Sequence, residues 1–459
     1  MAKSQSLKTL IILVLLSIFC TKSYSVTSGK RKTYTVKELI KSARSKNYAI
    51  RINAEKVYRA RQKIRVAMGR LLPSLNFGTI MAGVQQDYFD LVPSLLGFLF
   101  PSNWFLWKES KLYFEAERFN YGAMIANEIN AIESVSYRIL SVIDLEKIYI
   151  KYLKKVKKIV QLERKRRDAG EASAEVTVEF ENIQLRMEHD LYVLQNDISK
   201  MLSELAHTVA VDIDEDWDSF QIAAVKLPDL GSTTPVDSID LIDEIMGKSL
   251  EREALAYLRL AAKYSKYNRS FQFLSPDGDA DGSFGFGYLA NINIGKSYEY
   301  EVAIKQDELD SNILVAVRKA VSDHNFSIDL YSKSKLGYQN SLVWYDILNA
   351  KYNEVGEIEP SEYLKALESL LAFHSRLLQS QYNYLISKAQ IDRLTWNRSY
   401  YRDILDIVPT VKNTSRNNRT GSCISRWIKS LKRKEENQKI KRHIKKGRIQ
   451  LGTLKNNSI

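Results

Sequence analysis

The chain has 459 residues, of which 45 per cent are hydrophobic and 27 per cent charged, a composition typical of folded rather than disordered proteins. Its formal net charge of +14 suggests a polyanionic partner, but the two ends carry the excess. Residues 412–459 hold 15 Lys/Arg and two acids, and residues 1–25 hold three Lys and no acid, so residues 26–411 carry about −2. Because this body is close to neutral, we expect no nucleic-acid partner.

Residues 1–25 have the pattern of a secretory signal peptide. Lysines precede a short apolar run at 10–19, and small residues precede a cleavage site after Ser25. An uncleaved anchor is the alternative, but the run is about half of the roughly 20 residues that a spanning helix needs. Cleavage would remove Cys20 and leave only Cys423, so we expect an exported chain without an intrachain disulfide.

The next segment predicts a very long helix. Apolar residues recur from Ile125 to Val160 with a mean spacing of 3.5 residues, which is the period of a coiled-coil seam. A helix from Glu115 to Arg167 would be about 75 Å long at 1.5 Å per residue. Because helices in globular domains average about 12 residues, the sequence indicates an elongated architecture.

The chain also repeats itself. The segment Leu71–Ser74 recurs as Leu274–Asp277, and Gly170-Glu171 recurs as Gly356-Glu357, in the same order and the same pattern context. We therefore predict a duplication. The predicted divisions are a first repeat at 26–210, a linker at 211–236, a second repeat at 237–408, and a basic, disordered tail at 409–459.

Each repeat contains an aromatic segment that predicts a pair of strands, near 75–114 and near 271–300. In the first repeat the predicted strands are 75–84 and 103–114. Aromatic or apolar residues alternate with small or polar ones at 283–288 and again at 291–294, a period-2 pattern typical of strands. The aromatic density suits a membrane interface, although an ordinary core under a loop is the alternative. The candidate membrane-interface residues are Trp104, Phe105, Trp107, Phe284, Phe286 and Tyr288.

Several of these residues carry a family resemblance. The run Thr35–Ile40, followed by Ala43, Asn47 and Ala54 and then Leu72-Pro73-Ser74-Leu75, resembles the opening repeat of the TolC-like outer membrane efflux proteins. The segment Arg166–Ser173 is similar to the turn between that family's two long helices, and Gly356-Glu357-Ile358 with Tyr363–Ala366 resembles its second copy.

The resemblance implies a homotrimer in the outer membrane of a Gram-negative bacterium, touching outer-membrane lipid. Each protomer would give four strands to a shared barrel, and its helices would continue as a tunnel into the periplasm. The helical turns would meet a periplasmic adaptor protein and, through it, an inner-membrane pump. The candidate residues at these periplasmic tips are Arg166, Gly170, Ser173, Gly356 and Tyr363.

Other motifs are weaker. Residues 277–288 begin like a calcium loop but end in Tyr288 instead of a bidentate Glu, so a solvated hairpin is favoured. The spacing Gly285-x-Gly287-x-x-Ala290 imitates a dinucleotide fingerprint inside a predicted strand. The acidic cluster at 212–218 is favoured as a solvated linker. The five His are scattered, and we expect no metal, no cofactor and no enzyme activity.

The predicted fold class is mainly α with a membrane β-barrel, in which duplicated strand pairs and long antiparallel coiled-coil helices form a trimeric tunnel. The first functional hypothesis is a passive exit duct for efflux or type I secretion. The alternative is a periplasmic coiled-coil scaffold or adaptor without a barrel. For the basic tail around Trp427, disorder is favoured over a membrane-surface helix or contact with lipopolysaccharide or peptidoglycan.

Overall fold

A computed structural model of the chain describes residues 32–73, 96–171, 173–210, 220–274, 286–354 and 359–398. Two short strands and two sets of helices make up this part. The strands are β1 (Lys32–Tyr34) and β2 (Phe220–Ile222). The first set is α2 (Val36–Lys46), α3 (Tyr48–Gly69), η1 (Gly97–Leu99), α6 (Pro101–Asp168) and α7 (Ala174–Val209). The second set is α8 (Ser238–Lys248), α9 (Leu250–Phe271), η3 (Gln272–Leu274), α10 (Phe286–Glu354) and α11 (Pro360–Thr395).

The two sets match element by element, as a duplication predicts. Helices α2, α3, α6 and α7 have 11, 22, 68 and 36 residues, and α8, α9, α10 and α11 have 11, 22, 69 and 36. The junctions match as well, because Asn47 caps the start of α3 and Ser249 caps the start of α9 with their side chains. Each repeat is therefore a short helix, a capped bend and a long helical hairpin.

The predicted long helix is confirmed as α6, which begins at Pro101, well before the start at Glu115 that the helical pattern indicated. Most of its predicted seam is buried, and Ile129, Ile139 and Val156 have no exposed surface. The seam packs against α7 on one side and α11 on the other. A regular apolar spacing thus gives a long helix whose stability comes from its neighbours rather than from intrinsic propensity.

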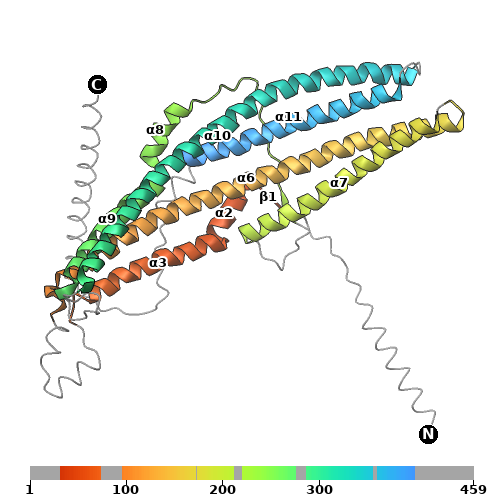
Figure 1. Cartoon of the computed structure of the whole chain (residues 1–459). Coiled ribbons are helices and arrows are strands. Elements are labelled where there is room, and N and C mark those ends of the chain that lie inside the picture. The colour runs from red at the N-terminus through yellow and green to blue at the C-terminus, as the bar shows by residue number, and fades with distance from the viewer. Residues whose placement is uncertain are drawn as a thin grey trace, which may run out of the picture. The chain divides into compact units, whose positions relative to one another are not determined.

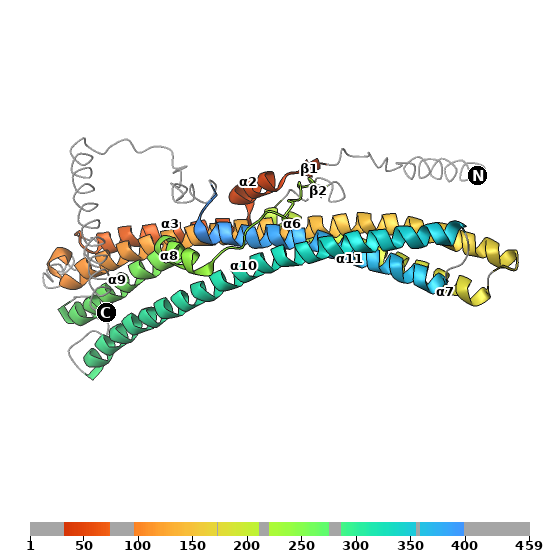
Figure 2. The ribbon, with the colours of Figure 1, turned by 90° about the horizontal axis from the view of Figure 1, so that it is seen from above.

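The long helices form a layer with two open edges (Figures 1 and 2). In the half that ends at the hairpin turns, α7 packs on α6, α6 on α11, and α11 on α10. In the other half, α3 packs on α6, α6 on α9, and α9 on α10. Helices α3 and α7 therefore line one edge of the layer, and α10 lines the other.

The predicted strand over residues 103–114 is wrong, because these residues begin α6. Pro101 occupies the first helical turn, where its fixed φ favours a helix. The buried Asn103 side chain donates to the carbonyls of Gly97 at 2.9 Å and Arg70 at 3.2 Å. This anchors the helix start, so that the aromatic side chains pack on α9 instead of forming a sheet.

The predicted strand at 283–294 is also wrong where the structure describes it, because residues 286–294 belong to α10. Here Asn291 and Gly295 are buried against α9, while Ile294 is exposed. A Cβ added at Gly295 would lie 3.0 Å from Lys266 Cα, so this glycine permits close helix packing. Residues 271–274 end α9 and form η3, and the other predicted strand residues, 75–84 and 275–285, lie outside the described part.

One small sheet was not predicted from the sequence. Strand β1 pairs in parallel with β2, with Thr33 opposite Gln221 and Tyr34 opposite Ile222. Pro228 and Asp229, which follow β2, accept hydrogen bonds from Gln381 of α11 at 2.9 Å and from Tyr331 of α10 at 2.8 Å. The stretch between the repeats is thus held against the second hairpin.

Candidate functional site: hairpin tips and layer edges

The turn between α6 and α7 is built by residues that the sequence pattern indicated. Gly170 has φ +77°, a left-handed conformation that costs any residue with a Cβ about 1–2 kcal/mol. The Glu171 amide donates to the Arg166 carbonyl at 2.8 Å and closes the end of α6. Ser173 then caps α7 by accepting from the Val176 amide at 3.3 Å. Gly356, selected for the second turn, lies outside the described residues.

Arg166 contacts the second hairpin of the same chain. Its guanidinium donates to the Glu163 carboxylate at 3.0 Å and to the Tyr352 carbonyl of α10 at 3.2 Å. The Tyr352 hydroxyl donates to the same Glu163 oxygen. Glu163 is buried, and a buried carboxylate is tolerable only when such partners compensate its lost hydration. We call this group of three residues the tip network.

Tyr363, also selected from the sequence, supports the tip network from α11. It is buried, and its ring stacks on the Tyr352 ring with centroids 4.7 Å apart. Its hydroxyl donates to Asn349 at 2.9 Å and lies 3.1 Å from the Tyr345 hydroxyl. Burial, followed by hydrogen bonding to Glu163, raises the pKa of Tyr352. The phenol is therefore held neutral as a donor, and the two hairpins are joined near their turns.

Further polar contacts join the hairpins along their length. The Tyr382 hydroxyl of α11 donates to Asp144 of α6 at 2.6 Å, and the Tyr152 hydroxyl lies 3.4 Å from His374 Nδ1. Burial, followed by the charge of Lys151, lowers the pKa of His374. The central pair of helices, α6 and α11, is thus fixed by several contacts inside the chain.

The opposite end of the layer gathers the selected aromatic residues. Phe105 lies against α9, with its ring centroid 5.5 Å from those of Tyr267 and Phe271. The Trp104 indole donates to the Phe98 carbonyl at 2.8 Å, and Trp107 packs edge-on to Trp104 at 6.0 Å.

Tyr288 belongs to the same end, because it lies in the first turn of α10 and donates to the Ser270 carbonyl near the end of α9 at 3.0 Å. Phe284 and the side chain of Phe286 lie outside the described residues. The structure therefore brings together four of the six aromatic residues that the sequence selected.

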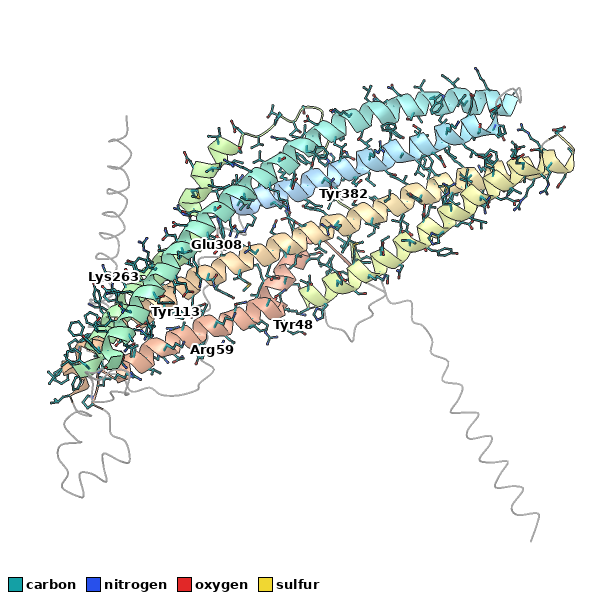
Figure 3. The ribbon with its side chains drawn as sticks, viewed as in Figure 1. Tyr48, Arg59, Tyr113, Lys263, Glu308 and Tyr382 are labelled. Carbon is teal, nitrogen blue, oxygen red and sulfur yellow. The ribbon has the colours of Figure 1, made fainter. Side chains whose placement is uncertain are left out.

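The exposed apolar faces of the two edges were not predicted from the sequence. Most of the large apolar side chains that are exposed on the described helices belong to α3, α7 and α10, whereas α11 carries none of them. On α3 they are Tyr48, Ile52, Val66 and Met68, and on α7 they are Val178, Leu185, Tyr192 and Val193. On α10 they are Leu289, Ile294, Tyr300, Ile304, Val315, Phe326, Leu336, Leu342, Val343, Trp344 and Ile347. Tyr48 and Arg59 mark the α3 edge in Figure 3. Extended apolar stripes of this kind mark surfaces that pack against another molecule.

Regular spacing could have revealed these stripes. Val178, Leu185 and Tyr192 follow one another at the heptad spacing of a coiled coil, as do Leu336 and Val343. Ile304, Val315 and Phe326 recur at the longer spacing typical of a right-handed supercoil. Searching the sequence for regular apolar spacing outside α6 would have found the stripes of both α7 and α10.

Among the described residues, no group of three or more His, Cys, Asp or Glu could hold a metal ion. Nor does any helix in the described part combine the length and the apolar character needed to cross a bilayer. The calcium-like loop at 277–282 and the acidic cluster at 212–218 lie outside these residues.

No protein-family model and no curated protein matches the sequence. Solved structures do match the fold. The outer-membrane channel OprN has 14 per cent identity and a TM-score of 0.64, with 78 per cent of this chain and 89 per cent of that chain covered. VceC of Vibrio cholerae has 13 per cent identity, a TM-score of 0.63 and coverage of 78 and 96 per cent. The Campylobacter jejuni channel CmeC has 14 per cent identity, a TM-score of 0.63 and coverage of 78 and 85 per cent.

The chain has the fold of these outer-membrane channels. At such low identities the likeness concerns the fold alone, and the resemblance to TolC-like proteins is confirmed at that level.

Proposed function

We propose that this protein is an outer-membrane exit duct, a passive homotrimeric channel with a periplasmic helical extension. The observation that carries the proposal is the pair of exposed apolar edges on a layer that has the fold of outer-membrane channels. A single layer of helices cannot enclose a lumen. Copies joined edge to edge can, and their joining would remove both apolar stripes from water.

The apolar positions on the α7 edge and on the α10 edge lie at matching distances from the hairpin turns. Leu185 and Val343 lie the same number of residues from the turn-side ends of their helices. These ends are Ala174, where α7 begins, and Glu354, where α10 ends. Tyr192 and Leu336, one heptad further from the turns, match in the same way. Because α6–α7 and α10–α11 both turn at the same end of the layer, these heptad positions face one another when α7 of one copy meets α10 of the next.

This pairing is heterologous, because one edge is made by α3 and α7 and the other by α10. Heterologous contacts close into a ring when the rotation between copies allows it. Three copies correspond to the homotrimer that the resemblance implies. In the closed ring the apolar stripes form seams, and the faces of the layer become the wall of the duct.

The hairpin turns form the periplasmic tips in this proposal. Gly170 and Ser173 shape the first turn, Gly356 comes between α10 and α11 in the sequence, and Arg166 and Tyr363 join the two hairpins. An adaptor protein would dock on these turns and connect the duct to an inner-membrane pump. The pump would supply the energy, and the duct itself would carry out no chemistry.

A second candidate function has one specific observation in its favour. Residues 103–114 and 286–294 are helical, so only residues 74–95 and 275–285, which lie outside the described part, are left of the two segments in which the sequence predicted strand pairs. The second of these segments is long enough for only one membrane strand of about 9–11 residues. This favours a periplasmic scaffold without a barrel, which is the alternative function.

Disulfide trapping tests the ring. A Cys423→Ser chain carrying both Leu185→Cys and Val343→Cys should form covalent dimers and trimers under mild oxidation in cells. The two positions are on opposite edges of one copy, so cross-links can form only between copies. A matched pair that keeps Leu185→Cys and replaces Leu289, at the other end of α10, by cysteine should give no cross-link.

Chains with either cysteine alone should stay monomeric on a non-reducing gel. If the double variant also stays monomeric, or if either single variant forms a dimer, the heterologous ring is contradicted.

A further inference from the structure

A cavity of about 360 Å³ lies where the end of α11 meets the start of α9. Both helices pack against α6 and α10 there, and an ion pair between Arg393 of α11 and Glu251 of α9 joins their ends. Glu308, which precedes the cavity residue Leu309 in α10, marks this region in Figure 3. The volume falls within the range of about 300–1,000 Å³ that is typical of small-molecule sites.

The duplication shows how this junction differs from its counterpart in the first repeat. There, Asn47 caps α3 and donates to the Thr208 carbonyl of α7 at 2.8 Å, which ties the two helix ends together. Ser249 takes the same place before α9, but its shorter side chain donates to Glu251 at 3.0 Å in the first turn of its own helix. In the second repeat the link is made instead by Glu251 and Arg393, and the cavity lies beside that link.

The cavity combines apolar walls with polar groups. Apolar side chains, among them the buried Ile245 and Ile313 and the indole of Trp396, form most of its surface. Between them lie four side-chain amides, from Asn127, Asn130, Asn312 and Gln390. Apolar walls with a few polar groups are typical of sites that hold a small amphipathic molecule in one orientation.

The charged residues of the lining indicate the polar group of such a molecule. They are Lys319, Arg393 and Glu251. Arg393 is more than nine-tenths buried, and its Nε–H has no acceptor in the described part of the chain. Lys319 is exposed and forms no ion pair with any described residue. A buried donor without an acceptor is costly, and a carboxylate can accept from both cations.

We propose that this cavity binds a small organic carboxylate, whose apolar body packs against Ile313 and Trp396. Its carboxylate meets Lys319 and Arg393, and the Asn130 amide can turn its NH₂ group toward the same anion. A neutral molecule of the same shape loses the ionic contact with Lys319. The proposal goes beyond the proposed function, because one copy of the chain supplies the whole cavity and no ring is needed.

A titration with two matched probes tests the charge preference. The native protein in mild detergent is titrated by calorimetry with 2-naphthoate and with 2-naphthamide, which differ in charge but share the ring system, and titrations into detergent alone are subtracted. The carboxylate should bind at least about fivefold more tightly, because an exposed ion pair contributes up to about fivefold in affinity.

Variants of one lysine show whether the preference comes from the cavity. Lys319→Gln should weaken 2-naphthoate binding about fivefold and leave 2-naphthamide binding unchanged, whereas Lys319→Arg should bind both probes like the parent. The matched control is Lys333→Gln, an exposed position on the same helix outside the cavity, which should also bind like the parent.

Thiol protection locates the bound probe. A chain with Cys20→Ser, Cys423→Ser and Ala316→Cys places one thiol in the lining of the cavity. Saturating 2-naphthoate should slow the reaction of this thiol with iodoacetamide at least about fivefold, since the probe covers it. Ala350→Cys in the same background places the thiol at an exposed position of α10 near the turns, and its reaction rate should not change.

Four results would overturn the proposal. They are equal affinity for the two probes, unchanged 2-naphthoate binding by Lys319→Gln, no protection of Ala316→Cys, and a thiol at this position that is unreactive even without the probe. The last result would mean that another part of the chain fills the cavity. None of these results affects the disulfide-trapped ring, and the absence of a ring would leave the cavity in place.

Discussion

The two ends of the helical layer use charge in opposite ways. At the tips, Glu163 is buried and is compensated inside the chain by Arg166 and Tyr352. At the opposite end, Lys63, Lys108, Lys263 and Lys296 are exposed on four different helices. Charges paired inside the chain hold its two hairpins together, whereas exposed lysines keep their ammonium groups in water.

The largest expected effect comes from disrupting the tip network of Glu163, Arg166 and Tyr352. Replacing Arg166 by Ala leaves the buried Glu163 carboxylate with the Tyr352 hydroxyl as its one remaining side-chain partner among the described residues. Removing one member of a buried pair costs about 3–5 kcal/mol, and we expect a loss of about 3 kcal/mol because Arg166 is partly exposed. Urea unfolding followed by circular dichroism measures this loss.

The neighbouring pair provides the control. Arg164 binds Glu181 at 2.8 Å at the surface, so Arg164→Ala should cost less than about 1 kcal/mol. Equal losses for the two variants would mean that the tip network does not join the hairpins.

A smaller effect is expected at the turn itself. No atom lies within 4 Å of a Cβ added at Gly170, so the cost of Gly170→Val comes from the backbone alone, about 1–2 kcal/mol. We expect impaired transport with trimer formation largely intact, for this variant and for Gly356→Val. Gly170→Asn tolerates the left-handed conformation better and should retain transport. Normal transport by both valine variants would show that the tips are wrongly placed.

The smallest effect concerns pH. Burial lowers the pKa of His374 and of His324, so folding favours the neutral form of both side chains. Their contribution to stability is present above the unfolded pKa of about 6.5 and is lost as pH falls through the folded pKa values. The melting temperature should therefore fall between pH 7.5 and 5.5.

Changing His324 and His374 to Asn should flatten that pH dependence, whereas His189→Asn, at an exposed position, should leave it unchanged. A slope that persists in the double variant would assign the pH dependence to other groups.

Much of the fold follows from local pattern. The 3.5-residue spacing in α6 predicts a long helix, its end near Arg167 and its buried face, but not its start. Gly170 predicts a turn because the left-handed backbone there excludes most other residues. The repeated Gly-Glu pair indicated the duplication that the matching helix lengths display. These features depend on residues close together in sequence.

The errors arise where contacts between residues far apart in the sequence determine the secondary structure. The aromatic residues of 103–114 and the alternation at 283–294 have strand propensity, but packing of Phe105 and Gly295 against α9 overrides it. The β1–β2 pair joins two short segments that are far apart in the chain, too short to show alternation.

The central claim, a ring of three copies in the outer membrane, is tested most directly by fractionating cells that make the native protein and measuring its oligomeric state in mild detergent. We predict a trimer in the outer-membrane fraction. A soluble monomer or dimer released from the periplasm by osmotic shock would contradict the ring and favour the scaffold.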